Sequence, residues 1–149
     1  MPLQIINYRQ AKDNDFDLTF TVKSNCTRQL IEKIWGWDNA LQIDYHQRQF
    51  NPNKTKIIIY KNVEVGYVSI ADKYDTILIE NILIHTAFQG KGIGTSVILD
   101  TIKIAVEQNK NIELQVFKIN ESATRFYERL NFEKFDQTDL HYKMRYKQD

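Results

Sequence analysis

The sequence has a single cysteine, no large excess of either charge and no long apolar run, and each of these absences excludes a class of protein. Its single cysteine, Cys26, cannot form an internal disulfide, which favours a reducing compartment. Lys and Arg number 20 against 19 Asp and Glu, so no charge excess indicates a nucleic acid or an anionic membrane as partner. No apolar stretch approaches the ~20 residues that cross a bilayer. We therefore expect a cytoplasmic protein that binds neither nucleic acid nor membranes.

Metal-binding patterns are also lacking. His46, His85 and His141 have no close ligand spacing, and a lone cysteine cannot complete a structural zinc site, so no metal is expected. The 149 residues suit one hydrophobic core and are few for two. The sequence therefore predicts a single domain over residues 1–149.

Hydrophobic periodicity predicts an α+β fold, with helices on both faces of a mostly antiparallel central sheet. Strands are expected near Leu3–Tyr8 and at Ile57–Tyr60, Val63–Ile70, Ile77–Ile84, Ile112–Phe117, Phe132–Phe135 and Leu140–Tyr146. Helices are expected from Asp13 or Asp15 through Phe20 to about Val22, from Thr27 to Phe50 with a break at Trp35–Trp37, from Gly92 to Gln108, and after Asn120.

Glycine is scarce, yet three of the five glycines lie in one short loop between a predicted strand and a predicted helix. The loop residues are Gln89, Gly90, Lys91, Gly92, Ile93, Gly94 and Thr95. Glycines let the backbone approach a ligand closely, and the N–H groups at a helix N-terminus suit a pyrophosphate. A plain turn would need about one glycine. The loop therefore predicts an anion site.

The spacing within this loop excludes two common nucleotide motifs. A P-loop needs Ser or Thr directly after Gly-Lys, whereas Gly92 follows Lys91 here. The dinucleotide motif Gly-x-Gly-x-x-Gly fails as well, because its last glycine would fall on Thr95 or Val97. Neither a P-loop nucleoside triphosphatase nor a Rossmann enzyme is expected.

Gln89, Gly92 and Gly94 resemble one signature of the GNAT superfamily, whose members are acyl-CoA-dependent N-acetyltransferases. A second signature, Asn-x-x-Ala-x-x-Phe-Tyr followed by Gly-Phe, is similar to a second set of residues further along the chain. That set is Asn120, Ala123, Phe126, Tyr127 and Asn131-Phe132. The departure is Asn131 in place of glycine, and Asn is the next-best residue for a positive φ. The resemblance covers nearly the whole chain.

The resemblance implies acetyl-CoA as co-substrate. The backbone of Ile82, Leu83 and Ile84 would bond the pantetheine arm, and the loop from Gln89 to Thr95 would hold the pyrophosphate. The residues expected around the rest of the cofactor are Asn120, Ala123, Phe126 and Tyr127. Two alternatives stay open at this point, because Asn120 also suits a helix cap and Phe126 also suits the core.

Direct attack of an amine on the thioester needs an oxyanion donor, a general acid and a general base. The N–H of Ile84 is a candidate oxyanion donor. The resemblance implies the Tyr127 hydroxyl as general acid beside the sulfur, although Tyr127 also suits a buried core position. Glu80 is the candidate base by strand alternation, or else a solvated strand residue. Weaker candidates for the base are Asp72, Asp75 and His46.

The acceptor, an amine of a small molecule or a peptide, is expected near Trp35, Trp37 and Glu80. Further polar and aromatic residues of that region are Asp38, Tyr45, His46 and Tyr74. Aromatic faces attract cations, although tryptophans equally often fill a core. The alternative function is a non-catalytic sensor that binds acyl-CoA. An interaction domain is disfavoured because it leaves the glycine loop unexplained, and both monomer and homodimer stay open.

Overall fold

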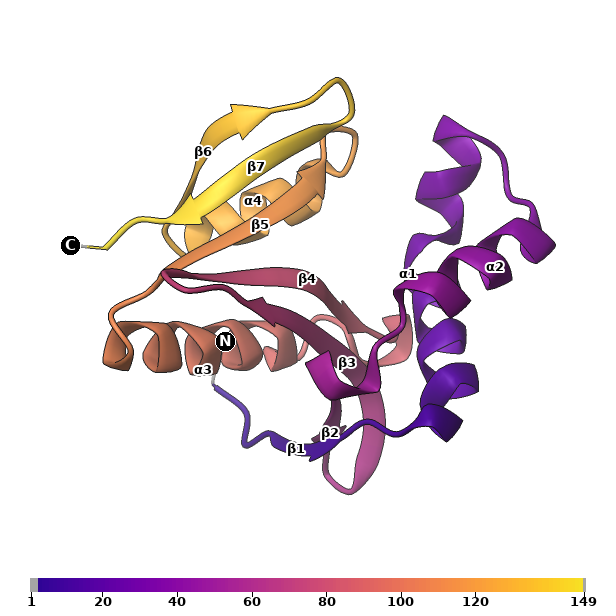
Figure 1. Cartoon of the computed structure of the whole chain (residues 1–149), viewed down its shortest axis with the longest axis horizontal. Helices are drawn as coiled ribbons and strands as arrows, with labels where there is room; N and C mark the ends of the chain where they lie inside the picture. Colours follow the sequence, from indigo (N-terminus) through magenta and orange to yellow (C-terminus); the bar gives the residue numbers. More distant parts are fainter. Residues whose placement is uncertain (1–2, 149) are drawn as a thin grey trace. The chain divides into compact units, whose positions relative to one another are not determined.

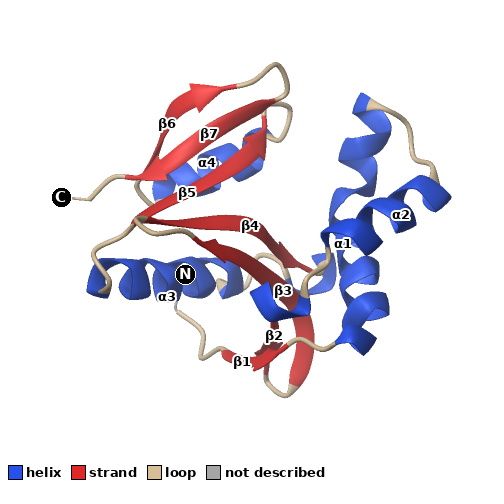
Figure 2. Cartoon of the chain, in the orientation of Figure 1, coloured by secondary structure: helices blue, strands red, loops and turns tan. Residues whose placement is uncertain are grey.

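The computed structural model of the chain describes residues 3–148, shown in Figure 1 and coloured by secondary structure in Figure 2. The α-helices among these residues are α1 (Phe16–Ile34), α2 (Asn39–Gln49), α3 (Ile93–Glu107) and α4 (Glu121–Arg129). The strands are β1 (Asn7–Gln10), β2 (Thr55–Tyr60), β3 (Val63–Asp72), β4 (Thr76–Ile84), β5 (Asn111–Phe117), β6 (Phe132–Gln137) and β7 (His141–Tyr146).

The seven strands form one sheet in the order β1-β2-β3-β4-β5-β7-β6. The pairs β1–β2, β2–β3, β5–β7 and β6–β7 are antiparallel, whereas β4 and β5 are parallel. This confirms the predicted α+β fold with a mostly antiparallel sheet. The three strands predicted between Ile57 and Ile84 are confirmed as neighbours in this sheet, and the turn between the first two uses positive φ angles at Lys61 (49°) and Asn62 (65°).

The chain divides into two compact units. The first unit contains residues up to Ser69 together with Asn81–Val97, and the second contains Ile70–Glu80 together with the residues from Ile98 onward. Strands β3 and β4 and helix α3 each contribute residues to both units. The single domain over residues 1–149 stays a prediction, and its end residues lie outside the described part of the chain.

In the first unit, β1 begins later than the sequence predicts. It spans Asn7–Gln10, where Asn7 pairs with Ile59 of β2, while Leu3 and Ile5 are 63% and 87% exposed. The prediction from Leu3 was wrong because apolar residues alone do not make a strand without a partner to pair with. Ile57 of β2, by contrast, is fully buried in the core of this unit with Val22 and Tyr67.

Helix α1 also differs from the prediction. It runs without interruption from Phe16 to Ile34, so the two helices expected near Val22 and from Thr27 are one (Figure 2). The predicted break after it is confirmed, since Gly36 has a φ of 80° and α2 begins only at Asn39.

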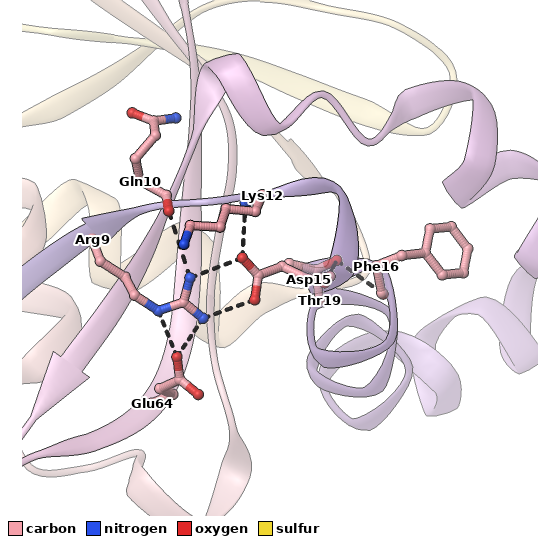
Figure 3. A network of polar contacts seen from close by, with 7 residues as sticks. All are labelled: Arg9, Gln10, Lys12, Asp15, Phe16, Thr19 and Glu64. Carbon is pink, nitrogen blue, oxygen red and sulfur yellow. Dashed lines mark hydrogen bonds and ion pairs between the residues drawn. The ribbon is translucent and has the colours of Figure 1, made fainter.

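Asp15 occupies the predicted N-cap position of α1 but does not cap the helix with its side chain. Its carboxylate accepts two bonds from the Arg9 guanidinium, at 2.7 and 2.8 Å, and one from the Lys12 N–H (Figure 3). Glu64 of β3 accepts the Arg9 Nε–H at 2.7 Å. The guanidinium holds the pKa of Asp15 below its usual value, and the two carboxylates raise the pKa of Arg9. Arg9 thus links β1, β3 and the start of α1.

In the second unit, β7 lies between β5 and β6, with Leu114 paired to Met144 and Phe132 to Tyr146. Helix α4 contacts β5 and β6, and Figure 1 shows it beside these strands. Ile112, Leu114, Phe132 and Met144 are buried here. Among residues 3–148, no helix has both the length and the apolar character that a membrane span requires.

Candidate active site

The carboxyl end of β4 is the first part of the candidate site. The parallel register of β4 with β5 ends at the pair Ile79–Leu114, while β4 itself continues to Ile84. The N–H of His85 donates to the Val65 carbonyl of β3 at 2.8 Å. Because backbone groups alternate between the two edges of a strand, the N–H of Ile84 points to the opposite edge from that of His85. A strand edge of this kind can bond an extended ligand.

Gly66 allows β3 and β4 to approach closely beside this end. A Cβ atom at Gly66 would lie 2.0 Å from the carbonyl oxygen of Leu83 and 3.0 Å from Cα of Ile84. Backbone atoms cannot yield as a flexible side chain does, so only glycine fits this position. The close approach of β3 and β4 thus explains why residue 66 is a glycine.

The glycine loop follows a short 3₁₀ turn, Thr86–Phe88. Gly90 and Gly92 have φ angles of 76° and 84°, a conformation that favours glycine. The Gly92 carbonyl accepts the Ser96 N–H at 3.1 Å, which is the first turn of α3. Glycine has no side chain to cap a helix, so the first N–H groups of α3 suit an external anion.

Gln4, which lies far from the glycine loop in the sequence, forms hydrogen bonds with it. Its side chain donates to the Lys91 carbonyl at 2.8 Å, and its backbone N–H donates to Ser96 Oγ at 2.9 Å. Ile93, the first residue of α3, is buried, whereas Gln89, Gly90 and Lys91 are exposed. Sequence reasoning missed Gln4, because nothing local links it to a loop so far along the chain.

The side chain of Gln89 has a structural partner. Its Nε2 donates to the Ile84 carbonyl at 2.8 Å, which ties the loop back to the end of β4. Gly94 and Thr95 lie in the first turn of α3 and are partly buried. The loop thus contributes backbone groups, and its glutamine maintains the loop's shape.

Helix α4 of the second unit carries the other predicted residues. Asn120 caps it as expected, because its Oδ1 accepts the Ala123 N–H at 3.2 Å. Asn131 ends the helix region with a φ of 71°, as its left-handed propensity predicts. Ala123 and Phe126 are partly buried, so neither is a fully enclosed core residue.

Tyr127 lies between two other rings of the second unit. The ring centroids of Phe126 and Phe132 are 5.2 and 5.8 Å from that of Tyr127, both in edge-to-face arrangements. Burial raises the pKa of Tyr127 to about 12, so the phenol keeps its proton at neutral pH. The hydroxyl can therefore donate a hydrogen bond to a developing thiolate.

The candidate bases differ in their surroundings. Glu80 is exposed on β4, directly after the last residue that pairs with β5. Asp72 accepts the Lys110 Nζ at 2.6 Å, and Asp75 accepts the Thr76 hydroxyl at 3.1 Å in the turn between β3 and β4. Both aspartates thus have hydrogen-bond partners, and Tyr74, in the turn between β3 and β4, is 99% exposed.

His46 is a buried structural residue of the first unit. It is 2% exposed, its Nε2 lies 2.8 Å from Thr19 Oγ1, and its ring is stacked on that of Phe50. Burial and the nearby Lys23 lower its pKa to about 4, which keeps the imidazole neutral at pH 7. The Thr19 bond joins α1 to α2, so His46 is poorly suited to accept a proton from a substrate.

Trp35 and Trp37 lie in the connection between α1 and α2. Trp35 is 62% exposed, and Trp37 is partly buried with the Arg28 guanidinium 5.3 Å from its ring centroid. The nearby Tyr45 ring likewise carries Arg48 at 5.1 Å. Two of the expected aromatic faces therefore already contact a cation of the chain. Asp38 is engaged as the N-cap of α2.

Residues 23–132 match the family model described as the acetyltransferase (GNAT) family. The chain belongs to the GNAT family. Both regions described above, the glycine loop and α4, lie inside the matched residues. Among the described residues, no group of three His, Cys, Asp or Glu side chains could hold a metal ion.

One curated relative is an uncharacterized N-acetyltransferase of Methanocaldococcus jannaschii, 35% identical to this GNAT chain over 71 residues. The match covers 47% of this chain and only 31% of that relative. The chain therefore spans about a third of the relative's length.

Solved structures share the fold at low sequence identity. The PaiA N-acetyltransferase of Thermoplasma acidophilum, in complex with coenzyme A, superposes with a TM-score of 0.79 at 14% identity, covering 97% of this chain and 100% of that one. An acetyltransferase of Thermus thermophilus gives 0.75 at 14% identity, covering 97% and 98%. The ribosomal-protein-S18-alanine N-acetyltransferase of Escherichia coli gives 0.70 at 14% identity, covering 95% and 93%.

Proposed function

We propose that this GNAT protein transfers an acetyl group from acetyl-CoA to an amine of a small molecule or a peptide. The observation that carries the proposal is the start of α3, where Gly90 and Gly92 take positive φ angles directly before the first N–H groups of the helix. The CoA complex of a structural neighbour supports the same cofactor.

The residues of the first unit suit two adjoining parts of the cofactor, the pantetheine arm and the pyrophosphate. The backbone of Ile82–Ile84, beyond the pairing with β5, would bond the pantetheine arm as an added strand. The loop Gln89–Thr95 would take the pyrophosphate. A Cβ at Gly90 would meet nothing within 4 Å, so the backbone there is open to a ligand. On α4, Asn120, Ala123 and Phe126 would shape the channel around the rest of the cofactor.

The transfer forms a C–N bond and breaks the C–S bond of the thioester. The amine loses one proton, for which Glu80 is the proposed general base, and the departing thiolate takes one, for which Tyr127 is the proposed general acid. The pKa of about 12 keeps the Tyr127 donor protonated. The outward N–H of Ile84 would stabilise the oxyanion. Trp35, Trp37 and Glu80 would line the acceptor side.

The Tyr127 role is tested by Tyr127→Phe with Tyr74→Phe as a matched control. Both remove one hydroxyl, and Tyr74 is almost fully exposed. We expect Tyr127→Phe to lower kcat by about 10²-fold or more while the acetyl-CoA affinity stays within about twofold. Thiol release with a panel of amines measures the rate, and calorimetry measures the affinity. Full turnover by Tyr127→Phe would remove it as the acid.

Glu80→Gln tests the base by the pH profile of kcat/KM. Loss of the base should reduce the rate by about 10²-fold and abolish the acidic limb of the profile. An unchanged profile would assign the proton transfer to water or to another residue.

The sensor alternative makes a different prediction for the unmodified protein. A sensor would be stabilised against heat by acetyl-CoA but would acetylate no amine across a broad panel. An absence of stabilisation by acetyl-CoA, with ATP and NAD run beside it, would overturn the cofactor assignment as a whole.

A further inference from the structure

Helix α1 reaches the end of β4 through the side chain of Asn25. Its Oδ1 accepts the Thr86 N–H at 2.9 Å, and its Nδ2 donates to the Thr86 hydroxyl at 3.0 Å. One amide thus satisfies a backbone group and a side-chain group of the same residue. The two residues are 61 positions apart, so these bonds are tertiary and not part of a local turn.

The next residue of α1 bonds the other side of the same junction. Cys26 Sγ lies 3.0 Å from the Ile84 carbonyl oxygen, which also accepts the Gln89 side chain at 2.8 Å. Burial raises the pKa of Cys26 to about 11, so the thiol stays protonated and can donate. Asn25 and Cys26 therefore hold the backbone on both sides of His85.

These contacts complete the hydrogen bonding of the segment that leads into the glycine loop. Each backbone N–H from His85 to Gln89 has an acceptor, and side chains supply two of these. The acceptors are, in order, the Val65 carbonyl, Asn25 Oδ1, His85 Nδ1, the His85 carbonyl and the Thr86 carbonyl. A segment bonded at every N–H has few conformations open to it.

We infer that Asn25 and Cys26 are positioning residues that hold the junction between β4 and the glycine loop in its ligand-binding shape. This inference rests on the proposed function, because it assigns acetyl-CoA to that loop. Neither residue belongs to the proposed catalytic or cofactor-contacting set. Asn25 and Cys26 lie on α1. Their bonds join this helix to the end of β4 and to the loop that is proposed to hold the cofactor.

Because the contacts of Asn25 with Thr86 are exposed, a positioning role can be distinguished from a contribution to overall stability. Asn25 and Thr86 are exposed, and a hydrogen bond in such a place adds little to the free energy of unfolding, because water can replace it. Loss of the Asn25 bonds should therefore loosen residues 84–91 locally while the global unfolding midpoint changes little. Binding would suffer more than stability, because the ligand would then have to order the loop.

Asn25→Ala is the decisive variant, and Asn25→Asp is the conservative one. The aspartate keeps an acceptor for the Thr86 N–H and gains an acceptor for the Thr86 hydroxyl, which can donate. Gln29→Ala is the control, because it removes an exposed amide one turn further along α1. Cys26→Ala and Cys26→Ser form a second pair, since the serine hydroxyl can still donate to the Ile84 carbonyl.

Calorimetric titration with acetyl-CoA and amide hydrogen exchange measure the two expected effects. For Asn25→Ala we expect about a tenfold weaker affinity and faster exchange at Thr86 and Gln89. We expect Asn25→Asp and Gln29→Ala to bind within about twofold of the unmodified chain, with kcat at saturating acetyl-CoA unchanged in all three.

The two proposals fail in different ways. If the unmodified chain binds acetyl-CoA and Asn25→Ala binds it equally well, the positioning role is wrong and the proposed function stands. A fall in the melting temperature as large as that of a core variant, with affinity lost in proportion, would make Asn25 a general structural residue instead. If the unmodified chain does not bind acetyl-CoA, the proposed function itself is wrong and this inference falls with it.

Discussion

The two compact units both combine polar bonds with ring packing, but they use them at different places. In the first unit, polar side chains hold the segments that lead into α1 and into the glycine loop, as Arg9 does with Asp15 and Asn25 with Thr86, while the rings around His46 pack between α1 and α2. In the second unit, the Tyr127 ring of the candidate site is itself held by ring contacts, with Phe126 and Phe132. Directional bonds fix backbone groups at set positions, whereas ring packing mainly excludes water. The difference fits a glycine loop whose proposed role uses backbone groups and a helix α4 whose proposed acid is a side chain.

The largest expected effect comes from removing the central ring of the second unit. Phe132 is 3% exposed, and its ring centroid lies 5.6 Å from that of Tyr146. Phe132→Ala should cost about 3–5 kcal/mol of the free energy of unfolding, measured by urea titration. Phe135 is 39% exposed, and Phe135→Ala should cost under about 1 kcal/mol. Equal losses would mean that the packing of Phe132 is not what stabilises this unit.

The first unit should respond most strongly to the loss of a charge partner. Arg9→Ala leaves the buried Asp15 carboxylate without its two guanidinium bonds, which should cost about 2–3 kcal/mol. Arg125→Ala removes an exposed pair with Glu121 in the second unit and should cost under about 0.5 kcal/mol. A double-mutant cycle of Arg9→Ala with Asp15→Ala isolates the coupling, and additive losses would contradict it.

Acid should weaken the first unit through His46. Its folded-state pKa of about 4 lies below the unfolded value of ~6.5, so the unfolded chain binds more protons between these values. Stability is therefore full above pH ~6.5 and falls as the pH drops towards 4, by about 2–3 kcal/mol. His46→Gln retains a partner for Thr19 without titrating. The difference in the free energy of unfolding between the unmodified chain and His46→Gln should not depend on pH above pH ~6.5 and should change below it. A difference that stayed constant down to pH 4 would contradict the role of His46 in acid sensitivity.

Trp fluorescence and circular dichroism make this test specific to one unit. Both tryptophans of the chain, Trp35 and Trp37, belong to the first unit. Fluorescence therefore follows the first unit, while far-ultraviolet dichroism follows the whole chain. An acid transition that appears in dichroism alone would place the sensitive group in the second unit.

The smallest effect is expected at the start of α4. Asn120→Ala removes the bond to the Ala123 N–H and should cost about 1 kcal/mol, which is about 2–4 °C in melting temperature. Asn120→Asp keeps the cap and should be nearly neutral for stability. If Asn120 also contacts the cofactor, both variants should bind acetyl-CoA more weakly, whereas equal binding by Asn120→Asp would restrict its role to capping.

The sequence predicted the strands from β2 to β7 closely, because each has its own apolar pattern and turn residues. The Lys61–Asn62 turn and the Asn120 cap, for example, depend on the side chains of neighbouring residues alone. The continuous helix α1 was missed. Residues 24–27, Ser-Asn-Cys-Thr, are poor helix formers, and the structure shows that two of them bond the end of β4. Tertiary bonds decide the conformation there.

Within the candidate site, the glycine loop was predictable because positive φ angles select glycine in any context. The roles of Gln4, Asn25 and Cys26 were not, since each depends on a partner more than 50 residues away. The surroundings of His46, a weaker candidate for the base, could not be predicted for the same reason. Only the folded chain shows that it is enclosed with Thr19 and three phenylalanine rings.

The strand order limits when the strands of the second unit can pair during synthesis on the ribosome. β7 pairs with both β5 and β6, and the register of β6 is entirely with β7. Before His141–Tyr146 is synthesised, β5 can therefore pair only with β4, and β6 has no strand to pair with. During that interval the ring of Phe132 has no Tyr146 to contact, so Tyr127 acquires its final surroundings only after the strand that closes the sheet has been made.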